Sequence, residues 1–342
     1  MSIFYKYVYM TNSIEERRVW KLKGGSYIIS LPKDWVEKVK DNQLVVIKDQ
    51  HFLVMYPKKH VLKKEAIVDM SKIKDPTLVS YYVLTYYMQG MERIKIRSTD
   101  VMDAQIKKRF RDIRNEMIGA DIVEEKSDYL VYEILLDVTQ QSISETIQKF
   151  NEFIEGVHVD TIKAIEELNK SLSEEIIERS KDGLKKYRLM IRQISIASQD
   201  PSVAKKIGID NFRQAIVYGT VASYLNRMLH HTSYCNQYVL KLFEGDEVAC
   251  DHVLRMAEVA QKMRNSSINA FIEKDLDSAL KVIKLMSIQR GLEDELLNYL
   301  NTGKVSVNIG IVYSMIGKEM RRVSGLSVGI ADALANLLLA PA

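Results

Sequence analysis

From about residue 142 to the end of the chain, apolar residues recur every three or four positions with only short interruptions. The first stretch sets this period with Ile143, Ile147, Phe150, Ile154 and Val157. Such a repeat places apolar side chains on one face of an α-helix and predicts a helical bundle rather than a sheet. The 342 residues contain only 5 prolines, so little in the chain interrupts long helices.

Breaks in this pattern divide the region into six long helices. One break is at Asp200-Pro201, and another is at Gly245. Three of the helices are expected after Gly245, at about residues 247–273, 275–301 and 305–339. Two groups of three helices indicate an internal repeat. We therefore expect two all-α domains, at residues 141–244 and 245–342.

Residues 15–57 have the pattern of short strands instead. The stretches "RRVWKL" and "SYIISL" flank Gly24-Gly25, which favours a hairpin turn. A short helix is expected at "LPKDWVEKV", and "QLVVIKD" and "HFLVMYP" predict a second hairpin around Asp49-Gln50. So few short strands cannot enclose a core, and a unit this small is expected to need a second chain.

Residues 66–140 predict a small α/β connecting domain. A helix is expected at residues 77–89, where Gly90 ends it, and "RIKIRS" follows as a strand. An amphipathic helix is expected at residues 103–118. The stretches "ADIVEE" and "YLVYEILL" then predict two more strands.

Basic residues are concentrated at the N-terminus, where residues 1–65 contain 13 Lys or Arg against 7 Asp or Glu in a chain of net charge +4. A basic module on a near-neutral body suggests a polyanionic partner for that module. The candidates for contact with such a partner, which for DNA would be the DNA-binding residues, are Arg17, Arg18, Lys21, Lys23 and Lys33. Arg can read guanine and Lys mostly neutralises phosphate. Successive residues of a strand point to opposite faces, so Arg17, Arg18 and Lys21 cannot all share one face. The prediction therefore concerns the five residues as a group. The alternative is that these basic residues only keep a half-exposed strand soluble.

A second basic stripe lies on the helix expected at residues 103–118. Lys107, Arg111 and Arg114 follow each other at helical spacing, with Lys108 beside them. The stripe would extend a DNA contact or receive an acidic partner. The alternative is an ordinary solvated helix face whose charge Asp112 and Glu116 partly compensate.

The N-terminal run "RRVWKLKGGSYIISLPKDWVEKV…QLVVIKD" resembles the SpoVT-AbrB (or MazE-like) DNA-binding fold in its Gly-Gly-Ser turn, its "SLPKDW" run and its trailing hairpin. In that fold, strands of two chains complete one barrel. The resemblance therefore implies a homodimeric, swapped-hairpin β-barrel at residues 1–65 that binds DNA.

The last 200 residues resemble PhoU, a phosphate-signalling regulator of two three-helix repeats. The stretch "IIERSKDGLKKYRLMIRQ" resembles the second helix of a repeat, and "LNRMLHHTSYCN" and "MRRVSGLSVGIAD" resemble its third helix. A SpoVT-AbrB domain followed by PhoU repeats resembles archaeal phosphate-uptake regulators. The expected fold is thus multidomain α+β: the dimeric barrel, the α/β connecting domain and a PhoU-like pair of three-helix bundles.

PhoU repeats commonly bind metal clusters through E/D-x-x-x-D pairs, because two carboxylates four residues apart share a helix face. The resemblance places those positions on residues without a carboxylate: Ser180, Leu184, Asn226, His230, Met286, Arg290, Arg321 and Gly325. Glu178 and Asp182 form such a pair but lie two residues early, about 200° around the helix, and are expected on a solvated face. We therefore expect no metal cluster.

A zinc site is an alternative that we weighed. His231 and Cys235 share a helix face, and Cys250 and His252 would have to supply the remaining two ligands of a tetrahedral site. The favoured interpretation is that Cys235 is a small apolar residue on or near the bundle seam.

The sequence contains no P-loop, no dinucleotide glycine fingerprint and no nucleophile elbow. We expect no enzymatic activity and no cofactor. Two cysteines argue against a disulfide-built secreted fold, and the apolar stretch at residues 326–340 is shorter than the ~20 residues of a bilayer crossing. We expect a cytoplasmic protein without membrane insertion.

These observations predict a DNA-binding transcriptional regulator linked to phosphate uptake. Its helical bundles would sense a signal or dock a protein partner. The alternative is a signalling adaptor whose barrel serves only for dimerisation and whose bundles bind a transporter or a kinase.

Overall fold

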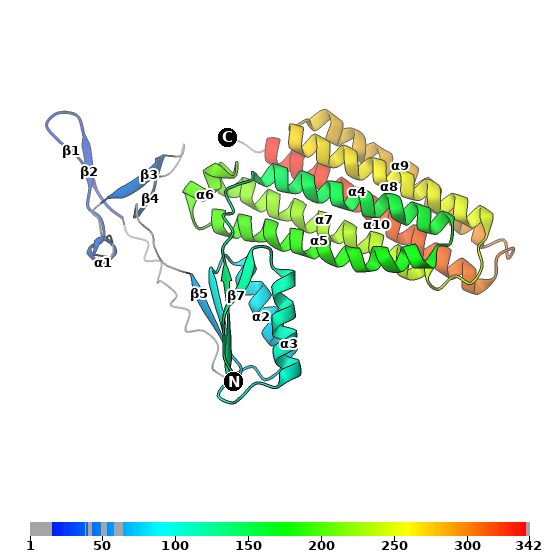
Figure 1. The fold of residues 1–342 in the computed structure, drawn as a ribbon. Helices are drawn as coiled ribbons and strands as arrows, with labels where there is room; N and C mark the ends of the chain where they lie inside the picture. The colour runs from blue at the N-terminus through cyan, green and yellow to red at the C-terminus, as the bar shows by residue number, and fades with distance from the viewer. Residues whose placement is uncertain (1–15, 38, 40–42, 49–52, 58–63, 340–342) are drawn as a thin grey trace. The chain divides into compact units, whose positions relative to one another are not determined.

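The computed structural model describes residues 16–37, 39, 43–48, 53–57 and 64–339. The chain divides into two compact units, Met1–Leu62 and Lys63–Ala342 (Figure 1). Each unit has its own secondary structure, so each is described by itself.

The N-terminal unit contains two antiparallel hairpins and one short helix. Strands β1 (Val19–Lys21) and β2 (Tyr27–Ile29) pair with each other, and so do β3 (Leu44–Lys48) and β4 (Leu53–Pro57). Helix α1 (Lys33–Val36) lies between the hairpins in sequence. The turn between β1 and β2 requires glycine, because both of its glycines adopt positive φ angles of 119° and 90°.

The described strands of this unit form two separate two-stranded sheets, and neither is closed. The closed barrel expected at residues 1–65 is therefore not found among the described residues of this unit. Strands of three to five residues are too short and too few to close on themselves. The turn predicted around Asp49-Gln50 lies outside the described residues.

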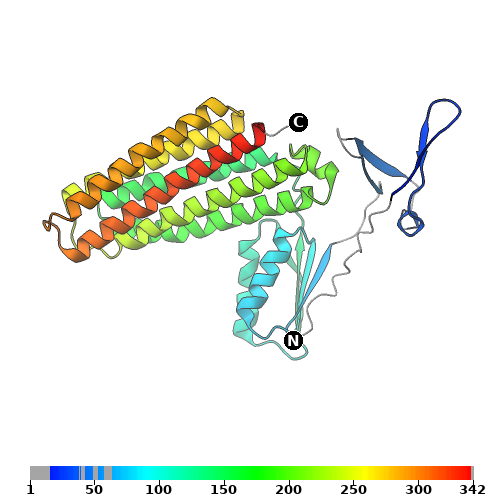
Figure 2. The same ribbon diagram turned by 180° about the vertical axis from the view of Figure 1, so that it is seen from behind.

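The second unit begins with a four-stranded sheet in the order β5-β6-β8-β7. The strands are β5 (Glu65–Asp69), β6 (Arg93–Arg97), β7 (Ala120–Glu125) and β8 (Tyr129–Ile134). Strands β5 and β6 are parallel, whereas β8 is antiparallel to both β6 and β7. Helices α2 (Pro76–Met88) and α3 (Ala104–Ile113) cover the same face of the sheet (Figures 1 and 2).

Alternation along the strands explains this layer. Ile94 and Ile96 of β6 and Leu130 and Tyr132 of β8 all point into the core beneath the helices, and Phe110 of α3 meets them there. Helix α3 is shorter than predicted, because a 3-10 turn, η1 (Arg114–Glu116), follows Ile113. Strand β5 was not predicted.

The rest of the unit contains the six predicted long helices and one short helix that was not predicted. In chain order these helices are α4 (Ile143–Glu166), α5 (Lys170–Ala197), the short α6 (Pro201–Lys206), α7 (Phe212–Val239), α8 (Glu247–Glu273), α9 (Leu276–Leu300) and α10 (Val307–Leu338). Helices α4, α5 and α7 pack together, as do α8, α9 and α10. The two groups meet where α7 packs against α10 and α4 against α8, and they share one continuous hydrophobic core. No described helix has the length and apolar content needed to cross a bilayer.

Buried polar side chains fix the α/β part to the bundle. Arg192 of α5 is only 2% exposed, and its Nη1 donates to the carbonyl oxygens of Tyr87 at 2.7 Å and Met91 at 2.9 Å. Its guanidinium also lies over the Tyr87 ring, 5.0 Å from the centroid. Gln193 Nε2 donates to the carbonyl oxygens of Val138 and Gln141. These bonds give partners to carbonyls just at or after the end of α2 and in the connection between β8 and α4, which would otherwise be costly to bury.

Candidate functional site

The five basic residues predicted to contact DNA lie in the N-terminal unit, and all are exposed. The structure gathers four of them on the first hairpin: Arg17 and Arg18 precede β1, Lys21 ends it, and Lys23 lies in the turn. Lys33 begins α1, where its Nζ lies 3.8 Å from Glu37 Oε1. Their contact with DNA stays a prediction.

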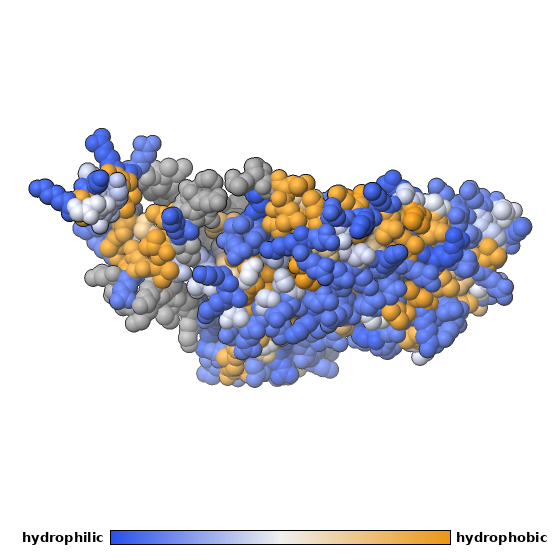
Figure 3. Space-filling model, turned by 90° about the horizontal axis from the view of Figure 1, so that it is seen from above, coloured by the Kyte–Doolittle hydropathy of each residue, from blue (hydrophilic) through white to orange (hydrophobic). Residues whose placement is uncertain are grey.

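The same hairpin also exposes apolar side chains. Those of Val19, Trp20, Leu22, Tyr27, Ile28 and Ile29 are between 44% and 65% exposed. Figure 3 shows apolar residues gathered on the N-terminal unit. Among the described residues up to 57, Val39 is the only buried apolar one. So many large apolar side chains in solvent on one hairpin are typical of an interface.

The prediction that the acidic pair on α5 lies on a solvated face is confirmed. Glu178 and Asp182 are exposed, and each forms a surface ion pair on its own helix, Glu178 with Lys181 and Asp182 with Lys185. Ser180 occupies one of the eight positions of the resembled metal ligands. It is buried, and its hydroxyl donates to the Ile176 carbonyl oxygen. The described residues contain no group of three or more His, Cys, Asp or Glu side chains arranged for a metal ion.

The four residues weighed for zinc have separate partners. Cys235 Sγ is buried and contacts the carbonyl oxygens of His231 and Ile316, whereas Cys250 Sγ lies 3.8 Å from the carbonyl oxygen of Ile165. Burial raises the pKa of the Cys235 thiol well above its usual value, which disfavours the thiolate that a metal needs. His252 Nδ1 lies 3.8 Å from Glu295. Cys235 thus behaves as the small apolar core residue that the sequence favoured.

Two carboxylates of β7 compensate part of the charge of the basic stripe on α3. Glu125 of β7 forms ion pairs with Lys107 at 3.3 Å and Arg111 at 2.5 Å. Arg114 lies 3.4 Å from Asp121 of the same strand. Carboxylates of β7 therefore compensate these cations, in addition to the Asp112 and Glu116 named from the sequence. Lys108, beside these cations, is exposed. Contact of the stripe with DNA or an acidic partner stays a prediction.

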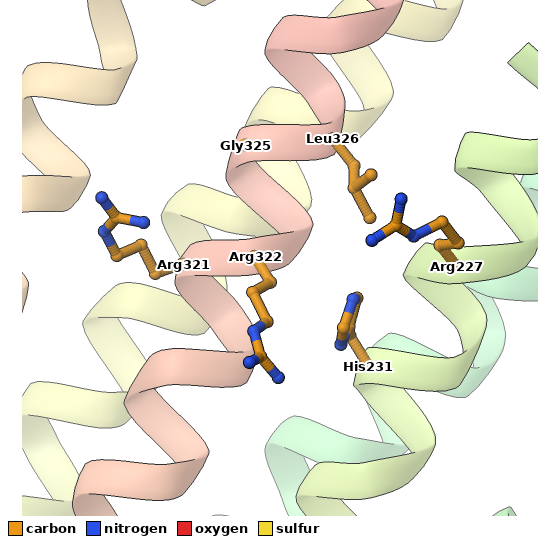
Figure 4. A pocket seen from close by; sticks show the side chains of 6 residues that line it. All are labelled: Arg227, His231, Arg321, Arg322, Gly325 and Leu326. Carbon is orange, nitrogen blue, oxygen red and sulfur yellow. The ribbon is translucent and has the colours of Figure 1, made fainter. Parts of the chain in front are cut away.

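A pocket of about 480 Å³ lies between α7 and α10, and its lining is strongly basic. The lining residues are Arg227, His231, Arg321, Arg322, Gly325 and Leu326. In Figure 4, Arg227 and His231 project from α7 toward α10, and Leu326 reaches from α10 toward Arg227. Arg321 extends to the other side of α10, where its Nε lies 2.5 Å from Glu293 of α9.

Glu319 of α10 binds two of the residues that line this pocket. Its side chain is almost fully buried, and Oε2 lies 2.5 Å from His231 Nδ1 while Oε1 accepts from Arg322 Nη1 at 2.7 Å. Burial lowers the pKa of His231, and the contact with Glu319 opposes that shift. The carboxylate thereby holds one side chain from each helix in place.

His231 was considered above for a zinc site, and Arg321 occupies a position of the resembled metal ligands. Arg227, Glu319 and Arg322 were not predicted as site residues. A signal was present in the two stretches that resemble third helices. Each contains Arg near its start, "LNR" at Arg227 and "MRR" at Arg321 and Arg322. Aligned third helices packed together would bring these arginines close.

Comparisons with known proteins agree with the helical architecture. Residues 253–334 match the PhoU domain family. The crystal structure of PhoU from Pseudomonas aeruginosa is similar at 17% identity and a TM-score of 0.52, covering 58% of this chain and 95% of that one. The phosphate transport system regulatory protein PhoU from Streptococcus pneumoniae has 16% identity and a TM-score of 0.49, covering 57% of this chain and 92% of that one. No curated protein matches the sequence.

The family match lies within the second group of three helices, from α8 to α10, and does not extend to the N-terminal unit. At 17% identity, the likeness to the Pseudomonas aeruginosa structure concerns the fold. The helical part of this chain is therefore PhoU-like: its fold is similar to that of PhoU, and residues 253–334 match the PhoU domain.

Proposed function

We propose that the chain is a non-enzymatic, cytoplasmic transcriptional regulator that binds DNA as a homodimer through residues 1–65. Its PhoU-like bundle receives a signal, or a protein partner, connected with phosphate uptake. One observation carries the proposal. The first hairpin exposes a row of apolar side chains and, beside them, four basic residues.

The apolar side chains support a dimer. At roughly 25 cal/mol per Å² of apolar surface, leaving such residues in water forfeits much of the stability a small unit needs. Pairing with the hairpins of a second chain would bury them and give the SpoVT-AbrB-like barrel that one chain alone lacks. A two-fold dimer would also present the basic set twice, as a palindromic site requires.

The link to phosphate uptake comes from the helical part. Its PhoU domain and PhoU fold support a regulatory role of the PhoU type. The order of domains, with a DNA-binding-like unit before PhoU repeats, resembles that of archaeal phosphate-uptake regulators. We propose accordingly that the bundle connects phosphate status to the DNA-binding unit.

Fluorescence anisotropy tests the proposal. The full chain is titrated with DNA from its own upstream region and with scrambled DNA over a salt series. We expect tighter binding to the upstream DNA, with a log–log salt slope that falls by up to about four units when Arg17→Ala and Arg18→Ala are combined in a dimer. The matched control combines Arg290→Gln and Lys304→Gln, two exposed cations of the bundle unit.

The adaptor alternative has a distinct signature in this experiment. Weak binding that is equal for both DNAs and disappears at physiological salt would reject the DNA-binding regulator. The N-terminal unit would then serve dimerisation alone. The bundle would be the part that binds a transporter or kinase, through an interface less sensitive to salt than phosphate contacts.

A further inference from the structure

The basic pocket between α7 and α10 is not explained by the packing of the bundle. Its lining contains four cationic or titratable basic side chains and no carboxylate. Arg321 is turned away and paired with Glu293, and Glu319 is buried, whereas Arg227 and Arg322 are exposed. The charge that a ligand would meet at the mouth of the pocket is therefore positive.

Arg227 is unmatched in this arrangement. Among the described residues, no carboxylate lies within ion-pair distance of its guanidinium and no hydrogen-bond acceptor is assigned to it. A guanidinium presents five N–H donors in a rigid fork that fits the oxygens of a phosphate or carboxylate. Arg227 points across the pocket toward α10, so its fork is available to a ligand held there (Figure 4).

Arg322 and His231 are already oriented for the same ligand. Glu319 binds Arg322 Nη1 and His231 Nδ1, which leaves the other guanidinium nitrogens of Arg322 as donors for the oxygens of a ligand. Neutral His231 with its proton on Nδ1 has an accepting Nε2, which suits the P–OH group of a hydrogen phosphate. Preorganised donors bind with less loss of side-chain entropy than mobile ones. The three groups come from two helices, so a ligand between them would bridge α7 and α10.

We propose that this pocket binds the phosphate group of a small phosphorylated molecule, either inorganic phosphate or a nucleotide. Two arginines and a histidine around one space are chemistry suited to a phosphate oxyanion. A volume of about 480 Å³ falls within the range of small-molecule pockets and leaves room beside the phosphate, against Leu326. The site is the signal input of the regulator proposed above, and its occupation requires no DNA.

Isothermal titration calorimetry on the full chain tests the site, in a chloride buffer free of phosphate. Inorganic phosphate and ATP are titrated separately. We expect saturable binding of one of them, at one site per chain, with Arg227→Gln weakening it roughly tenfold or more. Arg227 is exposed and unpaired, so its loss leaves no buried carboxylate without a partner.

The matched control is Arg213→Gln. Arg213 is an exposed arginine on the same helix, 14 residues or about 21 Å from Arg227, and it does not line the pocket. This variant is expected to bind like the wild type. Circular dichroism melting of both variants shows that each is folded. Arg322→Gln is a second test, with the expectation of a similar loss.

Three results would overturn the proposal. They are no saturable binding of either probe below about 1 mM, binding unchanged in both pocket variants, or equal losses in Arg227→Gln and Arg213→Gln, which indicate a diffuse charge effect. Binding of phosphate but not ATP, or the reverse, identifies the source of the phosphate group. Because DNA is absent, a failure of DNA binding in the anisotropy experiment leaves this result unaffected.

Discussion

His158 is a polar residue that the bundle buries completely. It lies on α4, with no solvent exposure, and its Nε2 donates to the Ala257 carbonyl oxygen of α8 at 3.0 Å. Its Nδ1 has no partner within the described part of the chain. Burial lowers the pKa of His158 from 6.5 to about 4, because the interior cannot solvate the imidazolium. The folded protein therefore needs this side chain neutral.

This burial predicts how stability depends on pH. Between pH 6.5 and about 4 the unfolded chain protonates His158 and the folded chain does not, so the unfolded state binds more protons. The stability contributed by this site is complete above pH 6.5. It falls as the pH drops through that window, by up to about 3 kcal/mol. We expect His158→Gln, which keeps an N–H donor but does not titrate, to make stability less dependent on pH here.

Urea denaturation at several pH values between 7 and 4 measures this effect. The comparison is the difference between wild type and variant at each pH, since the carboxylates contribute equally to both. His252→Gln, at a partly exposed histidine of α8, controls for the loss of an imidazole. A variant whose stability falls as steeply as the wild type's would show that His158 is not the titrating group.

At the scale of elements, the long helices could be predicted because their limits are set locally. The helix expected at residues 247–273 has those bounds as α8, where Asp246 accepts the Ala249 N–H at 2.8 Å. Helix α4 begins with a capping box of Ser142 and Glu145. Strand β5 was missed because its evidence is non-local: five residues become a strand by pairing with β6, some 28 residues later.

The candidate pocket could not be predicted for the same reason. Arg227 and Arg322 are 95 residues apart, and they share a pocket only because α7 packs against α10. Likewise, the basic stripe on α3 was visible in the sequence, but its partial compensation by Glu125 depends on how β7 lies beside that helix. The period of the sequence shows which residues share a face of a helix, but it does not show which other element packs against that face.

Close packing between helices leads to a second prediction, at Gly183 of α5. A Cβ at this position would lie 2.1 Å from Leu229 Cδ2 of α7 and 2.9 Å from Phe153 Cε1 of α4. Gly183→Ala is therefore expected to destabilise the protein by about 1–3 kcal/mol through overpacking, less the helix propensity gained. Thermal and urea unfolding, followed by circular dichroism, measure the change.

Gly291 of α9 provides the matched control. It is exposed, and a Cβ there would meet nothing within 4 Å. Gly291→Ala is expected to stabilise the protein by roughly 0.5–1 kcal/mol, because alanine favours the helix. If Gly183→Ala stabilised the protein as much, the close approach of α5 to its neighbours would not constrain this position.

At the scale of the whole molecule, the two units differ in how much of their apolar surface each buries. The second unit buries two hydrophobic clusters, one beneath its sheet and one along its helices. The N-terminal unit leaves most apolar side chains of its first hairpin in solvent. We therefore expect two chains to associate through the N-terminal unit, because association there would remove the exposed apolar side chains of the first hairpin from water.

The association can be tested at the paired positions Trp20 and Ile28, which lie opposite each other in the β1–β2 register. We expect Trp20→Lys combined with Ile28→Lys to convert a dimer into a monomer, since two charges would have to enter the interface unpaired. Light scattering coupled to size exclusion measures the mass. Phe243→Lys is the control, because Phe243 is 96% exposed on the second unit. A double variant that kept the mass of a dimer would place the dimer interface elsewhere. A monomeric variant with an unchanged helical melting transition would show that the bundle folds without the dimer interface.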